Sequence, residues 1–219
     1  MNRAGFIFML MFALLFLGCS SIRGALFAQE SAADIAFVRP LPPENTPKIE
    51  ASAVPKSILG NGRMDSKSLA HFLRKTNPLV EKDFAEDFAE IYVEEAALEG
   101  VNHDIAFSQM CLETGFLSFG GLVTPDMNNF CGLGSTGPGV PGERFPTARI
   151  GVRAQIQHLK VYATDAPLKQ ELVDPRRHLV PAGSAPTIDE LAGSWAQDRE
   201  YAEKIKKILN RLYKNSFTN

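Results

Sequence analysis

Apolar residues between Asp65 and Tyr213 recur at intervals of three and four, and this spacing constrains the fold more than any other feature of the chain. That interval is the period of a helix with one buried face, so the folded part is predicted to be mainly helical. Asp65 and Asn102 stand where N-cap residues are expected, and Gly100 stands where a helix should end. The pattern predicts helices over about residues 65–75, 78–99, 102–113, 151–163 and 200–213.

Two loops interrupt the helical pattern. Residues 132–146, GLGSTGPGVPGERFP, are too rich in glycine and proline for a helix and are predicted to form a turn-dominated lobe with at most a short hairpin. A proline-containing loop follows the next helix and ends at Thr187, where T-I-D-E forms a capping box with Glu190. The predicted domain, of about 150 residues, has an ordinary single-domain size.

The composition is that of a globular protein, because 45% of the 219 residues are hydrophobic and 22% are charged. The formal net charge of −2 gives no basic surface of the kind that binds nucleic acid, so no nucleic-acid partner is expected. The four histidines show no metal-ligand spacing such as H-E-x-x-H. We therefore expect no metal and no other cofactor.

The first residues have the pattern of an export signal. A short basic lead precedes an apolar run over residues 4–17, which is shorter than the ~20 residues of a membrane span but suits the core of a secretory signal. The run ends at Cys19 in a sequence that resembles the bacterial lipoprotein box. Residues 1–19 are thus predicted to be a lipoprotein signal with Cys19 as the lipid attachment site. The alternative is a plain signal cleaved further on, near Ala28.

Residues 20–64 contain several prolines and no lasting helical or strand period, so they are interpreted as a tether. The expected organisation is a signal over 1–19, a proline-rich tether over 20–64 and a catalytic domain over 65–215. Such a protein would be exported and anchored to a membrane of the cell envelope through its N-terminal lipid, facing the periplasm or the cell surface.

The stretch from Ile105 to Gly134 carries the main candidate for catalysis. A helix that is otherwise nearly uncharged brings Glu113 to its end, among Met110, Leu112 and Phe116. Burial among apolar groups raises the pKa of a carboxyl, which keeps it protonated as a general acid requires. The alternative is a solvated glutamate on a helix surface, which is the commoner situation for a glutamate.

Two cysteines lie within this stretch. In an oxidising compartment Cys111 and Cys131 could form a disulfide, and the alternative is two separate buried thiols. Cys111 is a poor candidate for a catalytic thiol, since it lies late in its helix and not at the N-terminus that stabilises a thiolate. Two positions along a helix also correspond to a turn of ~200°, so Cys111 and Glu113 face opposite ways.

Three segments in the same order resemble the glucosaminidase domains of glycoside hydrolase family 73, which includes bacterial autolysins and flagellar wall hydrolases. They are L-E-T-G-F at 112–116, N-N-F-C-G at 128–132 and W-A-Q-D-R-E-Y-A at 195–202. The resemblance spans roughly residues 80–212. It implies an α+β, mainly helical, lysozyme-like fold with one small irregular or β-hairpin lobe.

The resemblance also implies an activity and its residues. Glu113 falls on the family's general acid, and a second catalytic carboxylate is expected in the lobe, where Glu143 is the only acid. If Glu143 is idle, the acetamido group of the substrate could act in its place. The positions expected to bind substrate are Asn129, Phe130, Gly132, Trp195 and Tyr201. For Trp195 and Tyr201, packing in the core is the alternative.

The sequence departs from the family pattern at several motif positions. Thr114 and Phe116 replace the usual serine and tryptophan, Cys131 replaces a common phenylalanine, and Trp195 replaces a tyrosine. The predicted function is cleavage of β-1,4 bonds in peptidoglycan by a monomer of the N-acetylglucosaminidase kind. The alternatives are a lytic transglycosylase on the same fold and a non-catalytic lipoprotein that binds peptidoglycan.

Overall fold

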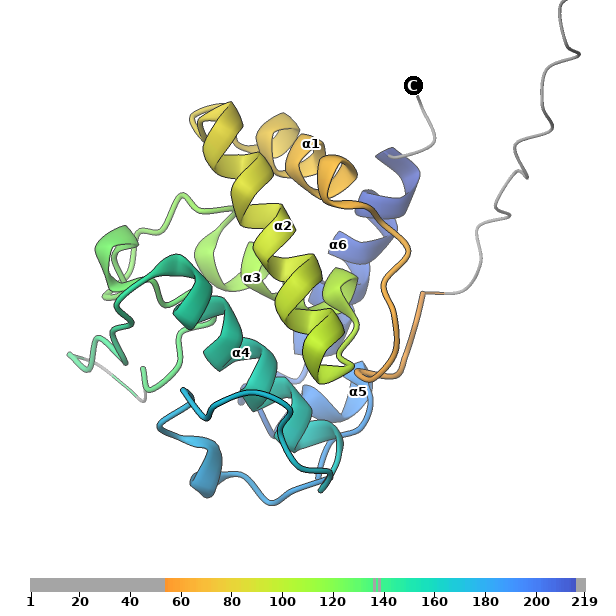
Figure 1. Ribbon diagram of the computed structural model, residues 1–219, viewed down its shortest axis with the longest axis vertical. Helices are drawn as coiled ribbons and strands as arrows, with labels where there is room; N and C mark the ends of the chain where they lie inside the picture. The colour runs from red at the N-terminus through yellow and green to blue at the C-terminus, as the bar shows by residue number, and fades with distance from the viewer. Residues whose placement is uncertain (1–53, 136, 138, 216–219) are drawn as a thin grey trace, which may run out of the picture. The chain divides into compact units, whose positions relative to one another are not determined.

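The helices expected from the apolar spacing are present in the computed structural model, which describes residues 54–135, 137 and 139–215 (Figure 1). The predicted signal, Cys19 and most of the predicted tether lie outside these residues. Within the described residues, no helix is long and apolar enough to cross a membrane. The helices are α1 (Ser66–Thr76), α2 (Lys82–Glu99), α3 (His103–Thr114), α4 (Ala148–Ala163), α5 (Ile188–Leu191) and α6 (Tyr201–Asn215), with short 3-10 turns η1 (Pro125–Met127) and η2 (Arg177–Leu179).

The predicted caps explain where several helices begin and end. The Asp65 side chain accepts a hydrogen bond from the Ser68 N–H at 2.8 Å, and the Asn102 side chain accepts from the first N–H groups of α3. Gly100 ends α2 with φ of 75°, a left-handed conformation that favours glycine. The capping box at Thr187 is formed, since its N–H and hydroxyl both donate to Glu190.

Two helices start elsewhere than predicted. The start of α2 is Lys82 and not Pro78, because the Asn77 side chain accepts from the Leu79 N–H and its carbonyl accepts from Val80, which makes a turn there. The start of α4 is Ala148, three residues before the predicted start, because Thr147 caps it through the Ile150 N–H.

α2 crosses the middle of the molecule, with α1 on one side and α4 on another (Figure 1). α3 packs on α2 and α6, and α5 packs on α6. Tyr92 is fully buried at the centre, with its ring edge-to-face against Phe88 at 5.2 Å and Phe107 at 5.3 Å. This aromatic group links α2 to α3, the helix that carries the candidate acid.

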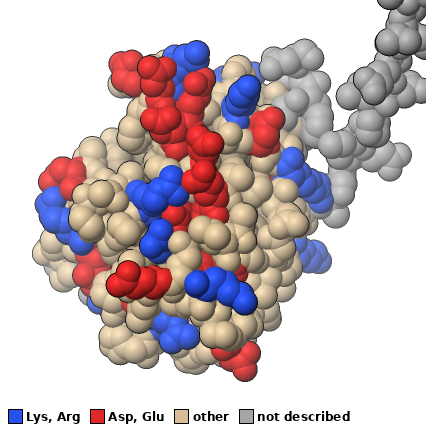
Figure 2. Space-filling model, in the orientation of Figure 1, with Lys and Arg blue, Asp and Glu red and all other residues tan. Residues whose placement is uncertain are grey.

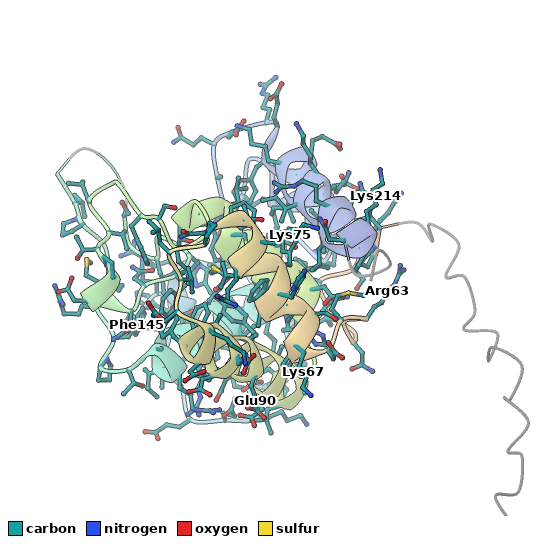
Figure 3. The ribbon with its side chains drawn as sticks, turned by 90° about the horizontal axis from the view of Figure 1, so that it is seen from above. Arg63, Lys67, Lys75, Glu90, Phe145 and Lys214 are labelled. Atoms are coloured by element: carbon teal, nitrogen blue, oxygen red, sulfur yellow. The ribbon has the colours of Figure 1, made fainter. Side chains whose placement is uncertain are left out.

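The segment 54–64, predicted as the end of the tether, packs on the domain. Ile58 is 0% exposed, and its backbone bonds to Pro186 and Asn102. The Arg63 guanidinium lies over the Tyr213 ring at 5.0 Å, and Figure 3 shows Arg63 on the same side as the end of α6. This packing could not be predicted from the sequence. The segment is held by backbone hydrogen bonds and a buried isoleucine, and it has no regular spacing of apolar residues.

The lobe of residues 132–146 is irregular. In its described part no strand forms, so the hairpin alternative is not found there, and in the described chain β structure is limited to isolated bridges such as Leu59 with Val101. The lobe is held by the Asn129 side chain, which donates to the Leu133 and Glu143 carbonyls and accepts from the Leu133 N–H, each at 2.9 Å. A side chain thus replaces the ladder of a hairpin.

Acidic side chains gather along α2 on the face shown in Figure 2. Two of them turn inward: Glu95 bonds to Arg153, and Glu99 bonds to Lys160 at 2.7 Å. These pairs tie α2 to α4.

Candidate active site

Glu113 occupies the last turn of α3. The helix stops directly after it, because Gly115 takes the left-handed conformation with φ of 58° and the Thr114 hydroxyl bonds the Met110 carbonyl. The carboxyl therefore stands at the negative end of the helix dipole, where an anion is disfavoured. The L-E-T-G motif is the sequence that places an acid at a helix end.

Two aromatic side chains hold the Glu113 carboxyl. The Tyr201 hydroxyl, from the start of α6, donates to Glu113 Oε1 at 2.5 Å, and the Trp195 side chain also favours the ionised form of this carboxyl. Burial raises the pKa of Glu113 above its ordinary value, and Tyr201 and Trp195 offset this only in part. Glu113 therefore stays protonated up to a higher pH than a glutamate exposed to water.

Two hollows lie near the end of α3, and Glu113 lines one of them. One, of about 320 Å³, is lined by Glu113, Phe119, Asn129 and Gly132 among others. A second, of about 230 Å³, is lined by Trp195 and His158. The two share Gly132 and Ser135, so they adjoin at the end of the Asn-Asn turn (residues 128–132). We refer to the two adjoining hollows together as the cleft.

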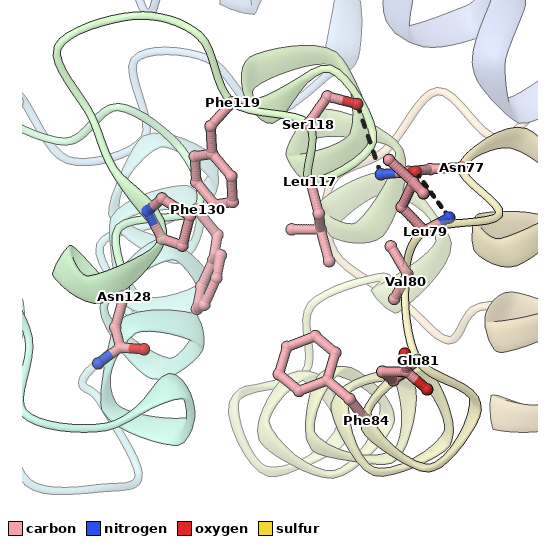
Figure 4. A pocket seen from close by; sticks show the side chains of 11 residues that line it. Asn77, Leu79, Val80, Glu81, Phe84, Leu117, Ser118, Phe119, Asn128 and Phe130 are labelled. Atoms are coloured by element: carbon pink, nitrogen blue, oxygen red, sulfur yellow. Dashed lines mark hydrogen bonds between the residues drawn. The ribbon is translucent and has the colours of Figure 1, made fainter.

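A third, apolar pocket of about 560 Å³ adjoins this cleft through Phe119, which lines both (Figure 4). Phe84, Leu117 and Phe130 face its interior. Its position extends the hollow surface from the acid toward the start of α2.

Two of the predicted substrate contacts have structural roles. Phe130 is 3% exposed and packs edge-to-face on Phe88, with ring centroids 4.7 Å apart, so its ring belongs to the core and to the apolar pocket and not to the cleft beside Glu113. Asn129 is 0% exposed, and its amide is occupied by the lobe. Of the turn residues, Gly132 is the one that borders both hollows of the cleft.

The late motif provides both Trp195 and Tyr201. Trp195 is half-buried, packs edge-to-face on His158 at 5.0 Å and still lines one hollow. Tyr201 is 4% exposed and reaches the site only through its hydroxyl on Glu113. Asp198 forms the turn that leads into α6, since its side chain accepts from the Glu200 N–H and its carbonyl accepts from the Tyr201 N–H.

Glu143 is turned toward Arg176, with a Glu143 Oε1 to Arg176 Nη1 distance of 3.5 Å. Its side chain also packs over Gly134. It is absent from the described residues that line the two hollows, whereas Arg176 borders one of them. The structure thus does not bring Glu143 together with Glu113 in one hollow.

The possible disulfide is not found, and the alternative of two separate buried thiols is, since Cys111 and Cys131 are both free and buried. Cys111 packs in the main core, whereas Cys131 packs with Leu133, Phe145 and the start of the lobe. Burial raises the pKa of both thiols, which keeps them protonated. In the described part of the chain, no three His, Cys, Asp or Glu side chains converge as a metal site requires.

Three polar side chains near the site are buried, and the sequence interpretation did not predict their burial: Gln109, Gln155 and His158. His158 Nδ1 bonds Asp174 at 2.7 Å, and Gln109 Nε2 donates to the Tyr201 hydroxyl at 3.0 Å. A polar residue at an inward-facing helix position was the available signal, since such groups are buried only with partners.

A mainly helical domain with a carboxylic acid at a helix end, inside an open cleft, has the fold and site of a polysaccharide-cleaving hydrolase. Residues 89–214 match the family model of the glucosaminidase domain, described as mannosyl-glycoprotein endo-beta-N-acetylglucosaminidase. The chain belongs to this family, which confirms the resemblance predicted from the three motifs. It is a glycoside hydrolase that acts on peptidoglycan.

The chain is also similar to an individual protein. An uncharacterized protein of Borreliella burgdorferi is 42% identical over 155 residues, which cover 71% of this chain and 76% of that protein. No solved structure matches the chain.

Proposed function

We propose that this hydrolase is an N-acetylglucosaminidase that cleaves β-1,4 bonds of the peptidoglycan glycan strand, with Glu113 as the general acid. One observation carries the proposal: the Glu113 carboxyl lines one hollow of the cleft, beside the Gly132 that borders both, with a raised pKa and with Tyr201 on one oxygen. A glycan strand lying across both hollows would place a glycosidic oxygen beside the acid.

In this mechanism Glu113 gives its proton to the leaving glycosidic oxygen as the bond to the anomeric carbon breaks. The ring carbon then develops oxocarbenium character. Trp195 offers a ring for packing against a sugar, and Gly132 leaves the backbone open beside the acid. The Asn-Asn turn acts as the floor of the cleft.

The group that assists from the opposite side is the acetamido group of the substrate. Its carbonyl oxygen attacks the anomeric carbon while the glycosidic bond breaks, and water then opens the cyclic intermediate. The position of Glu143 supports this choice, because Glu143 pairs with Arg176 and does not line the hollows around Glu113.

The test is product analysis with two matched variants. Purified protein should release new reducing ends from peptidoglycan, and Glu113→Gln should lower the rate by at least ~100-fold, the contribution of a general acid. Glu143→Gln should keep most of the activity. Full activity in a folded Glu113→Gln variant would overturn the assignment of the acid.

A lytic transglycosylase is the second candidate, and one observation favours it. Among the described residues that line the two hollows, Glu113 is the only carboxylic acid, and one acid suffices for that reaction. Mass spectrometry separates the two, since a transglycosylase leaves an anhydro-muramyl end and a hydrolase leaves a reducing end. A chain that binds peptidoglycan and yields neither product would be a non-catalytic binding lipoprotein.

We also propose export and anchoring through lipid on Cys19, on the evidence of the N-terminal sequence alone. The lipid would hold a monomeric enzyme at a membrane of the cell envelope, beside its substrate. Labelled fatty acid should be incorporated into the wild type and not into Cys19→Ser. Equal labelling of both would exclude this anchor.

A further inference from the structure

A row of buried hydrogen bonds runs from the centre of the core to Glu113. The Tyr92 hydroxyl donates to Gln155 Oε1 at 2.6 Å, and Gln155 Nε2 donates to Gln109 Oε1 at 2.9 Å. Gln109 Nε2 donates to the Tyr201 hydroxyl at 3.0 Å, and that hydroxyl donates to Glu113 Oε1 at 2.5 Å. The first four of these residues come from α2, α4, α3 and α6 and are at most 4% exposed.

The direction of this row is fixed at its far end. Gln155 Nε2 also donates to the backbone carbonyl of Ala106 at 3.0 Å. A carbonyl only accepts, so the nitrogen of the Gln155 amide must lie on that side and its oxygen must face Tyr92. Gln109 then has to present its oxygen to Gln155 and its nitrogen to Tyr201.

This orientation of Gln109 fixes the direction in which the Tyr201 hydroxyl donates. Its oxygen accepts from Gln109, so its single hydrogen points at Glu113 Oε1. Tyr201 itself does not ionise in the working range, because burial and the nearby Glu113 raise its pKa well above the ordinary value. Glu113 Oε1 is consequently always an acceptor.

We propose that Gln109 and Gln155 are positioning residues, which act through Tyr201 to keep the acid proton of Glu113 on Oε2, the oxygen that faces the cleft. This inference rests on the proposed role of Glu113 as general acid. Gly132 supports it, because a Cβ built at Gly132, which borders both hollows, would lie 3.7 Å from Glu113 Oε2. The row of hydrogen bonds thus keeps the Glu113 proton on the side of the carboxyl where the substrate would bind.

The other groups that act on Glu113 do not account for this arrangement. Cys131, from the Asn-Asn turn, is a thiol with a pKa raised first by burial and then by Glu113, and Trp195 provides only an indole N–H. Neither belongs to the buried row that reaches Oε1 through Tyr201. The sense of the Tyr201 hydrogen bond therefore depends on Gln109.

The test replaces Gln109 with methionine, which has nearly the same shape and no donor, in the whole chain. Ser108→Ala is the matched control, because Ser108 is the neighbouring buried residue of α3 and its hydroxyl has no partner among the described residues. In Gln109→Met the Tyr201 hydroxyl can accept from a protonated Glu113, so the proton can move to Oε1. We expect kcat to fall about tenfold with KM unchanged.

A second readout does not need activity. Without the Gln109 donor, Tyr201 stabilises the Glu113 carboxylate less, so the pKa of Glu113 should rise above that of the wild type. Carbon-13 NMR of the glutamate carboxyls, with Glu113→Gln to identify the resonance, measures this titration. Because activity falls as Glu113 loses its proton, the basic limb of the kcat profile should move to higher pH by the same amount. Ser108→Ala should change neither.

The outcomes separate the inference from the proposed function. A folded Gln109→Met variant with the wild-type Glu113 titration overturns the positioning role, and so does an equal change in Ser108→Ala. If Gln109→Met does not fold, Tyr201→Phe breaks the last link of the row and should shift the titration in the same direction. A titration shift in a protein that cleaves no glycan would support the row and reject Glu113 as the acid of a glycosidase.

Discussion

Gly151 shows how one residue positions the cleft floor. It lies in the first turns of α4, directly against the Asn-Asn turn, and a Cβ at Gly151 would come within 1.8 Å of the Asn128 carbonyl oxygen. No side chain fits at that distance. The turn that borders the cleft at Gly132 can therefore lie on α4 only because residue 151 is a glycine.

Whether Gly151→Ala raises or lowers the free energy of unfolding tests this contact. In a helix interior, alanine is usually more stable than glycine by about 1 kcal/mol. Here the methyl group must push the turn away from α4, and we expect a loss of about 2 kcal/mol in the free energy of unfolding. Denaturant unfolding measures it. A gain in stability would show that the turn moves aside at no cost.

Activity provides the second readout of that substitution. Moving the turn displaces Gly132 relative to Glu113, and small displacements of a reacting geometry can cost up to ~100-fold in rate. We therefore expect kcat to fall in Gly151→Ala even where the protein is fully folded.

At the scale of elements, Glu99 of α2 holds both α4 and the connection that follows it. Its carboxylate accepts from Lys160, which is 4% exposed, and from the backbone N–H groups of Lys169 and Gln170. Burial opposes ionisation of Glu99, but these hydrogen bonds outweigh it and lower its pKa below the ordinary 4.5. The charge of Glu99 thus stabilises the folded state.

Glu99→Gln should lower the free energy of unfolding by about 2–3 kcal/mol at neutral pH, because it leaves the Lys160 charge buried without a counter-charge. Since the folded-state pKa is depressed, the stabilisation is complete above pH 4.5 and is lost as pH falls through the folded value. The difference in the free energy of unfolding between wild type and Glu99→Gln should therefore become smaller at acidic pH. Denaturant unfolding across that range measures it.

Glu86→Gln is the matched control on the same helix. Glu86 is an exposed partner of Lys82 at 3.7 Å, and such pairs contribute less than about 0.5 kcal/mol. A loss in Glu86→Gln as large as that in Glu99→Gln would mean that charge on α2, and not burial at Glu99, sets the stability.

The elements were predictable wherever a period or a cap marks them. Asn102 and Gly100 bound α3 and α2 as expected, because their side-chain and backbone geometry is local. The start of α2 was not, since the turn at Asn77 depends on hydrogen bonds that propensity does not show. The lobe was predictable as irregular, but its clamp by Asn129 joins residues too far apart for a local pattern.

At the scale of the whole molecule, the three motifs contain the acid and its direct partners but not their support. Glu113 and Tyr201 are 88 residues apart, and the resemblance placed both at the site. Gln109 and Gln155 connect Glu113 and Tyr201 to Tyr92 across four helices. The spacing of apolar residues does not distinguish these two glutamines from exposed ones. The sequence motifs thus pointed to Glu113 and Tyr201, which the structure brings together, but not to the buried network beneath them.

The segment 54–64 packs against α3 and α6 on the side of the domain away from the lobe. Asp104, 0% exposed, accepts from the Arg63 N–H at 2.6 Å and from the Tyr213 hydroxyl at 3.0 Å, so it joins the segment 54–64 to α3 and α6. Figure 3 shows this side opposite to Phe145 of the lobe. The domain therefore needs more of the chain than the matched family region contains.

Two truncations test that requirement. A chain that begins at Val54 should unfold at the wild-type temperature, because it keeps every described contact of the domain. A chain that begins at Asp65 loses the buried Ile58 and Met64, each worth about 1.5–3 kcal/mol, and leaves Asp104 without its backbone donors. We expect its melting temperature to fall by more than 10 °C.

An internal substitution separates packing from chain length in this test. Ile58→Ala in the otherwise complete chain removes one buried side chain and should cost about 2–4 kcal/mol by itself. Leu79→Ala is the control, because Leu79 is 90% exposed and should change stability little. If the chain from Asp65 and Ile58→Ala both melt like the wild type, residues 54–64 only rest on the domain and the fold is complete without them.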